Sequence, residues 1–195
     1  INYHEEKVQQ FILKNKEHLS IGITIDGTEM KHDLNRVYKA SGRGSYKDVV
    51  RNIPLWLSQF PDASTKVTIS SADIPYIKES VLHLYALGIH EVNINCVFED
   101  VWKAGDDRLF EEQLLMLADA IIDNGYYRDY SCSFFGEHLG KPLDCKLQNQ
   151  NWCGAGMMLA VDAMGNFYPC TRFAQYSLRN KKAWIIGNIH DGIDK

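Results

Sequence analysis

The sequence predicts an α/β protein in which strands and helices alternate along a parallel sheet. Three stretches rich in β-branched residues lie at 19–26, 66–70 and 91–98, and each is followed by apolar residues at helical spacing. This order is typical of right-handed βαβ units. With 195 residues and 45% hydrophobic content, the chain is long enough to bury a sizeable core.

Local patterns predict the first elements. Apolar residues at helical spacing indicate a packing helix within 3–18, and alternation over 19–26 indicates a strand that ends at Asp26. A long apolar stripe predicts a helix over 45–60. Pro54 lies inside this stripe and indicates either a kink or different helix limits.

The following elements repeat the alternation. The segment 66–70 predicts a second strand, after which Asp73 can cap a helix that Gly88 ends. Strand 91–98 and helix 109–124 complete the pattern. No internal repeat interrupts it.

The charge balance predicts neither a nucleic acid nor an anionic membrane as a partner. Lys and Arg number 21 against 25 Asp and Glu, and the charges are interspersed. No apolar run approaches the roughly 20 residues that span a bilayer, so we expect a cytoplasmic protein. The chain starts at Ile1 without Met. We expect it to be a piece of a longer polypeptide.

A first candidate site follows the first strand. Thr24 supplies a hydroxyl, Asp26 a carboxylate and Arg36 a guanidinium ten residues beyond that carboxylate. The carboxyl ends of parallel strands are where α/β proteins bind ligands, and Arg pairs with carboxylates in bidentate fashion. These residues could hold a ligand that carries both an amine and a carboxylate. The alternative is an ordinary turn, with Asp26 as a helix cap and Arg36 on the surface.

A second candidate site lies near the end of the chain. Two short strands, 157–161 and 167–168, with turn residues between them, predict a β-hairpin flanked by Cys153 and Cys170. Two thiols brought together by a hairpin can form a disulfide, a metal or cluster site, or two buried thiols.

The chain has five cysteines, an odd number, and is too large to need disulfide staples. Reduced thiols or metal ligands are therefore expected. Cys96 lies within a strand pattern and is expected to be a buried small hydrophobe. Cys132 is left out of the site.

Both candidate sites resemble motifs of one enzyme family. One motif consists of Cys153 followed, after eleven residues, by Gly165-x4-Cys170. This spacing resembles the opening of the SPASM domain of radical S-adenosylmethionine (SAM) peptide-modifying enzymes. The segment 24–36 resembles the S-I-D-G-x4-H-D-x2-R stretch on the fourth strand of these enzymes, and 42–50 resembles the segment that comes next in them.

The resemblance implies the domain organisation. Residues 1–125 would form the second half of a partial (β/α)6 radical SAM barrel, 126–144 a linker, and 145–195 the start of the SPASM domain with its β-hairpin. The family's Cys-x3-Cys-x2-Cys loop and Gly-Gly-Glu segment do not occur in this sequence. The chain alone is therefore expected to be inactive, as a fragment of a radical SAM oxidoreductase.

The resemblance also implies the roles of the site residues. Thr24, Asp26 and Arg36 would lie on the SAM-facing rim, with Arg36 binding the methionyl carboxylate and Arg43 as a weaker candidate. Cys145, Cys153 and Cys170 would be three ligands of an auxiliary [4Fe-4S] cluster, the fourth lying beyond Lys195. The alternative for the thiols is a zinc site that includes a histidine such as His138.

The function implied is modification of a precursor peptide or protein. In the parent enzyme a [4Fe-4S] cluster, reduced by an electron donor such as flavodoxin or ferredoxin, would transfer one electron to SAM and cleave it to methionine and a 5'-deoxyadenosyl radical. That radical would take hydrogen from a side chain or Cα of the substrate.

Within the family, the sequence favours a ribosomal-peptide maturase of the thioether type. Thr171 follows Cys170 where sulfatase (formylglycine) maturases carry an acidic residue. A sulfatase maturase remains the alternative. An alternative of another class is a non-catalytic peptide-binding α/β module with a structural zinc hairpin.

Overall fold

The computed structural model describes residues 3–136, 139, 157–175, 177 and 181–193. The chain divides into two compact units, Ile1–Leu139 and Gly140–Lys195. Cys145, Cys153 and His138 lie outside the described residues, so the expectations for them stay predictions. No helix in the described part of the chain is long and apolar enough to cross a membrane.

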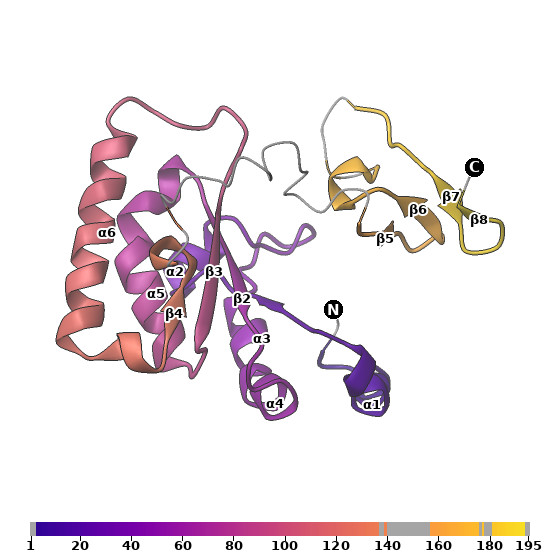
Figure 1. Cartoon of the computed structure of the whole chain (residues 1–195), viewed down its shortest axis with the longest axis horizontal. Coiled ribbons are helices and arrows are strands. Elements are labelled where there is room, and N and C mark those ends of the chain that lie inside the picture. Colours follow the sequence, from indigo (N-terminus) through magenta and orange to yellow (C-terminus); the bar gives the residue numbers. More distant parts are fainter. Residues whose placement is uncertain (1–2, 137–138, 140–156, 176, 178–180, 194–195) are drawn as a thin grey trace, which may run out of the picture. The chain divides into compact units, whose positions relative to one another are not determined.

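The first unit contains a four-stranded parallel sheet, which confirms the predicted α/β class (Figure 1). Its order is β1-β2-β3-β4, and every neighbouring pair is parallel. The strands are β1 (Ile23–Thr24), β2 (Thr65–Ile69), β3 (Glu91–Cys96) and β4 (Ser131–Cys132). Strand β4 falls inside the range 126–144 that the sequence predicts to be a linker, so the first unit extends past residue 125.

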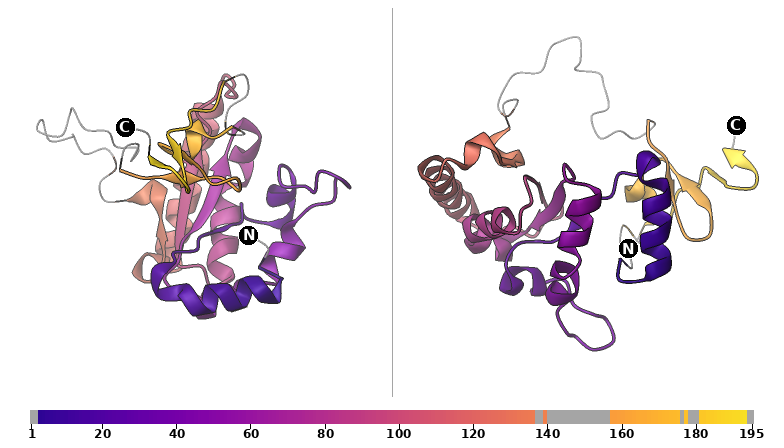
Figure 2. Two further views of the ribbon diagram at one scale, coloured as in Figure 1. Left: turned by 90° about the vertical axis from the view of Figure 1, so that its right-hand side faces the viewer. Right: turned by 90° about the horizontal axis from the view of Figure 1, so that it is seen from below.

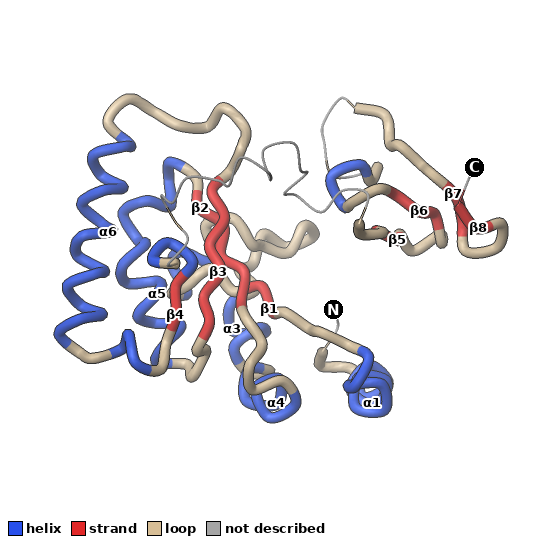
Figure 3. Tube along the Cα trace, in the orientation of Figure 1, coloured by secondary structure: helices blue, strands red, loops and turns tan. Residues whose placement is uncertain are grey.

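Helices connect the strands (Figure 3). The α-helices are α1 (Glu6–Asn15), α2 (Glu29–Asp33), α3 (Tyr46–Val50), α4 (Ile53–Gln59), α5 (Ile77–Ala86) and α6 (Asp106–Asp123). Short 3-10 helices are η1 (Lys16–His18), η2 (Ser71–Tyr76), η3 (Tyr126–Arg128) and η4 (Ser133–Phe135). The single helix predicted over 45–60 is two helices. Pro54 lies in the first turn of α4, where its missing N–H costs no hydrogen bond.

The helices cover one face of the sheet. The strands follow one another in the sheet in the same order as in the chain. Because crossovers between parallel strands are right-handed, this order places the connecting helices on the same side of the sheet. Trp56 of α4, Leu84 of α5 and Leu117 of α6 are fully buried in one core with the inward-facing strand residues. Figure 2 shows α5 and α6 together on one side of the strands.

The other face of the sheet is polar. Along β2, Lys66 and Thr68 are exposed while their neighbours are buried. Asn93 and Asn95 continue this face on β3, at the same alternate positions. Parallel sheets are normally covered on both faces. A polar face that none of the connecting helices covers is therefore suited to a ligand or to another part of a protein.

The second unit contains a four-stranded antiparallel sheet of order β5-β6-β7-β8. Its strands are β5 (Ala160–Val161), β6 (Asn166–Tyr168), β7 (Gly187–Asn188) and β8 (Gly192–Ile193), and η6 (Thr171–Phe173) follows β6. Asp162 organises the turn between β5 and β6, because its carboxylate accepts the N–H groups of Met164 and Asn166 and the Tyr168 hydroxyl. These hydrogen bonds, that of Tyr168 foremost, lower the pKa of Asp162 to about 2.

Candidate ligand site at the carboxyl ends of the strands

Asp26 is a buried carboxylate two residues after the end of β1. Its side chain is 3% exposed. Oδ1 accepts the Thr68 backbone N–H at 2.9 Å, and Arg36 binds both carboxylate oxygens, through Nε to Oδ2 and through Nη2 to Oδ1 at 3.3 Å. Burial of such a carboxylate is tolerated because it is paired and hydrogen-bonded. Asp26 therefore serves as a fixed anchor for Arg36.

Arg36 remains partly open to solvent. Its side chain is 34% exposed, in contrast to that of Asp26. A guanidinium has five N–H donors, and the pair with Asp26 uses Nε and one proton of Nη2. The remaining donors meet no hydrogen-bond acceptor among the described residues. Arg36 is thus a cation fixed by its ion pair with Asp26, and its other N–H groups are available to bind an anionic group.

Lys31 links the ends of two strands. It is 1% exposed on α2, and Nζ donates to the Thr68 carbonyl at 2.6 Å. Nζ also lies 3.4 Å from Asp73 Oδ1 and 4.0 Å from Asp26 Oδ1. Burial lowers the pKa of Lys31, and the two carboxylates oppose that shift. Two carboxylates and two cations therefore balance each other in this network.

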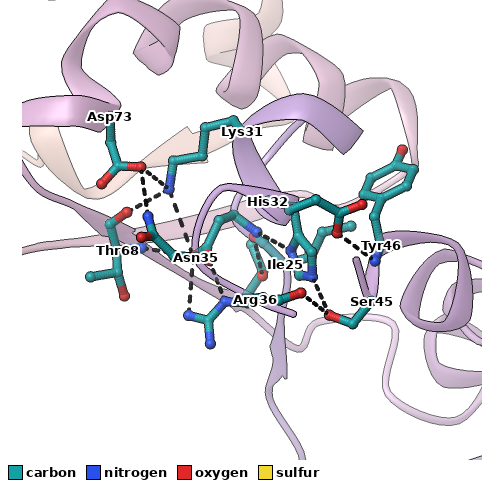
Figure 4. A network of polar contacts seen from close by, with 12 residues as sticks. Ile25, Lys31, His32, Asn35, Arg36, Ser45, Tyr46, Thr68 and Asp73 are labelled. Carbon is teal, nitrogen blue, oxygen red and sulfur yellow. Dashed lines mark hydrogen bonds and ion pairs between the residues drawn. The ribbon is translucent and has the colours of Figure 1, made fainter. Parts of the chain in front are cut away.

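His32 is fully buried, and Figure 4 shows its ring facing Ser45. Nδ1 accepts the Asp26 backbone N–H at 3.1 Å, and Nε2 lies 3.0 Å from Ser45 Oγ. The Ser45 hydroxyl donates to the Arg36 carbonyl at 2.8 Å, so it must accept from His32. This network assigns the neutral ring with its proton on Nε2. Burial, the largest cause, lowers the pKa of His32.

Asp73 closes the network at the end of β2. Oδ2 accepts the Ser70 backbone N–H at 2.8 Å and the Ser70 hydroxyl at 2.6 Å. Oδ1 accepts the Asn35 side-chain amide at 3.3 Å. Asp73 is therefore held from β2, from α2 through Lys31, and from the segment after α2.

A pocket of about 230 Å³ opens at this network. Asp26, Thr68, Ser70 and Val97 line it from the carboxyl ends of β1, β2 and β3. Asn35 and Arg36, which follow α2, and Asp73 of η2 complete the lining. Ligand pockets in proteins commonly measure about 300 Å³ or more. This pocket is therefore of a size to hold one part of a ligand, with Arg36 available to its charged end.

The structure brings two of the three predicted rim residues together. Asp26 and Arg36 form the pair, but Thr24 is exposed and lines a separate cavity of about 310 Å³ beside the outer edge of β1. Asp26 does not cap a helix, because Thr28 is the residue that caps α2. Arg43 lies outside the pocket, on Asp48 Oδ2 at 2.6 Å.

Sequence reasoning missed Lys31. A buried lysine has no signature of its own, and its partners Thr68 and Asp73 lie about forty residues away. A helical signal was nevertheless present, since Thr28 can cap a helix that contains Lys31. Asn35 lies just beyond that helix and reaches Asp73 from there.

Comparison with known proteins yields matches only among solved structures. No protein-family model matches the chain, and no curated protein does. The structure of anSMEcpe with bound AdoMet and Cp18Cys peptide matches with a TM-score of 0.65 and 21% identity, over 96% of this chain and 52% of that one. The structure of anSMEcpe with AdoMet and Kp18Cys peptide matches with a TM-score of 0.64 and 21% identity, over the same shares of the two chains.

This chain has the fold of anSMEcpe. A third structure, a histidine-tagged form of anSMEcpe with AdoMet, gives a TM-score of 0.64 at 20% identity over 95% of this chain and 49% of that one. The neighbour is an anaerobic sulfatase-maturating enzyme of the radical SAM/SPASM class, the class that the sequence motifs resemble. The chain spans about half of the length of anSMEcpe.

The fold shared with anSMEcpe leaves the cysteine ligands untested. Cys170 is 9% exposed after β6, whereas Cys145 and Cys153 lie outside the described residues. The described residues contain no group of three His, Cys, Asp or Glu able to hold a metal ion. Cys96 is half-buried rather than buried as predicted, beside Trp102 in a pocket at the end of β3. Cys132 is buried in β4, which raises its thiol pKa to about 11.

Proposed function

We propose that this chain is part of a radical SAM enzyme that modifies a peptide or protein side chain, and that Arg36 binds the carboxylate of SAM. The observation that carries the proposal is the Asp26–Arg36 pair, in which a buried carboxylate holds a guanidinium with donors to spare. Its pocket lies at the carboxyl ends of parallel strands, where α/β folds bind ligands.

Arg36 fits the carboxylate end of an amino acid. A guanidinium already paired on one edge can present its other N–H groups to a second carboxylate, and bidentate pairs of this kind are strong and directional. Thr68 lines the same pocket and can offer a hydroxyl proton to the ligand. The Ser70 hydroxyl also lines it but donates its proton to Asp73, so it can only accept a hydrogen bond from the ligand. The ammonium group of SAM would be bound elsewhere, since the resemblance assigns it to a Gly-Gly-Glu segment that this sequence lacks.

The cluster chemistry belongs to the same proposal. In the parent enzyme, SAM together with a reduced [4Fe-4S] cluster supplies the radical that removes hydrogen from the substrate. We propose Cys145, Cys153 and Cys170 as ligands of an auxiliary cluster, and a flavodoxin or ferredoxin as electron donor. Of these three cysteines, Cys170 is the one that lies within the described residues, where it is a free, buried thiol.

The proposed substrate is a precursor peptide. Two of the three anSMEcpe structures were solved with a peptide bound, which supports a peptide partner for the shared fold. Thr171, where sulfatase maturases carry an acidic residue, favours a thioether-type maturase. A sulfatase maturase, the class of anSMEcpe, is the second candidate.

The test is turnover by the parent polypeptide. Reconstituted without oxygen, reduced with dithionite and given SAM, it should release 5'-deoxyadenosine and methionine. An aldehyde formed on a cysteine-containing peptide would identify a sulfatase-type maturase, whereas a thioether crosslink would identify the favoured class. A cluster-replete parent that released neither product, with or without peptide, would refute the enzyme assignment. Stoichiometric zinc without sulfide would support the binding module.

A further inference from the structure

We propose that His32 positions the Asp26–Arg36 pair, and that only the neutral imidazole with its proton on Nε2 can do so. His32 is fully buried and does not line the pocket, so its action on a ligand is exerted through other residues. The inference rests on the proposed function for the identity of the ligand, SAM. The positioning itself follows from contacts within the chain.

His32 reaches both members of the pair. Its Nδ1 accepts the backbone N–H of Asp26, and its Nε2–H donates to Ser45 Oγ. Ser45 then holds the Arg36 carbonyl twice, through its hydroxyl at 2.8 Å and through its N–H at 3.0 Å. The Arg36 N–H returns to the His32 carbonyl at 3.1 Å. One ring thus fixes the backbone on both sides of the ion pair.

Protonation of Nδ1 would break this arrangement. It would set two N–H donors against each other at the 3.1 Å contact with Asp26, and it would place a cation at a site with no exposure to water. The backbone of Asp26 would have to move away, and the carboxylate that holds Arg36 would move with it. The pocket would then lose its oriented guanidinium.

The charged surroundings do not remove this constraint. Four charged groups act on the ring: Asp26 after β1, Lys31 and Asp33 on α2, and Arg36 in the following loop. Burial lowers the pKa of His32 most, the two cations add to that shift, and the two carboxylates oppose it. Two uncharged groups also meet the ring, namely the Ser45 hydroxyl and the Tyr46 ring, whose centroid lies 5.9 Å away.

The test is a pH titration of the full chain by nitrogen-edited NMR. In the wild-type chain we expect His32 to show an unprotonated Nδ1 and a protonated Nε2 near neutral pH. We expect the Arg36 Nε–H signal to vanish with the same acidic midpoint as the His32 ring. The wild-type titration needs no variant, so it decides the question even where a variant fails to fold.

Two variants sharpen the result. His32→Asn keeps an acceptor for the Asp26 N–H but cannot be protonated, so the Arg36 Nε–H signal should persist below the wild-type midpoint. His18→Asn removes an exposed histidine and should leave the wild-type profile unchanged. A protonated Nδ1 at neutral pH, or the same Arg36 midpoint in wild type and His32→Asn, would overturn the proposal.

SAM binding by the reconstituted parent polypeptide separates this inference from the proposed function. Affinity should fall about tenfold for each pH unit below the His32 midpoint, because binding then requires the loss of one proton. His32→Asn should flatten this dependence. Linked His32 and Arg36 titrations in a protein that binds no SAM would refute the proposed function and leave the positioning role standing. A pH-independent SAM affinity in the wild type would refute the positioning role.

Discussion

Gly27, directly after Asp26, has no room for a side chain. Its φ of 123° lies in the region that favours glycine, and a Cβ there would lie 2.2 Å from both Cβ and Oγ of Ser80. We expect Gly27→Ala to lower the free energy of unfolding by about 2 to 4 kcal/mol, from backbone strain and overpacking. Urea unfolding measures this loss.

Gly42 provides the matched control. Its φ is 66°, but a Cβ there would meet nothing within 4 Å. Gly42→Ala should therefore cost only the backbone strain, about 1 kcal/mol. Equal losses for the two variants would show that contact with Ser80 does not limit the turn after Asp26.

Lys31 is the buried cation shared by Asp26 and Asp73. Lys31→Met keeps the apolar stem but leaves Asp26 and Asp73 without their shared cation, and it should cost about 3 to 5 kcal/mol of stability. Lys47→Met removes a surface pair with Glu29 whose lysine is 76% exposed, and should cost less than about 1 kcal/mol. Thermal unfolding of both variants checks the difference. Similar small losses would mean that the buried network does not depend on Lys31.

At the scale of elements, the sequence predicts which segments are strands and helices better than it predicts their ends. β2 and β3 lie within a residue or two of their predicted limits because β-branched residues alternate along them. The strand predicted over 19–26 shortens to β1, since only Ile23 and Thr24 find partners on β2. Strand ends depend on pairing with distant residues, which local patterns do not reveal.

The start of η2 shows how a cap can be assigned to the wrong residue. The sequence predicts Asp73 as the cap of the helix after β2, but Ser70 is the N-cap and Asp73 is the third residue of a capping box. Ser70→Ala should therefore cost about 0.5 to 2 kcal/mol. Ser58→Ala, which loses an exposed bond to the Leu55 carbonyl, should stay within about 0.5 kcal/mol of wild type. Equal effects in urea unfolding would exclude a stabilising capping box.

At the scale of the whole chain, alternation of strands and helices predicts the parallel sheet, and the order of motifs points to the fold found in anSMEcpe. The candidate site is only partly predictable. Asp26 and Arg36 lie within one local motif, so the sequence predicts that both belong to one site, but it does not predict the ion pair between them. Two other contacts depend on how β1, α2 and β2 pack in three dimensions. They are the ion pair of Lys31 with Asp73 and the hydrogen bond from the Thr68 N–H to Asp26.

We propose that Arg36, held by Asp26, binds the carboxylate of SAM. The most direct test is calorimetric titration of SAM into the reconstituted parent polypeptide, comparing wild type with Arg36→Lys and Arg43→Lys. Lysine keeps the positive charge but lacks the planar fork, so Arg36→Lys should weaken binding by about tenfold or more. Arg43→Lys should bind as wild type, because Arg43 lies on Asp48 outside the pocket. Wild-type affinity in Arg36→Lys, or a larger loss in Arg43→Lys, would contradict the account.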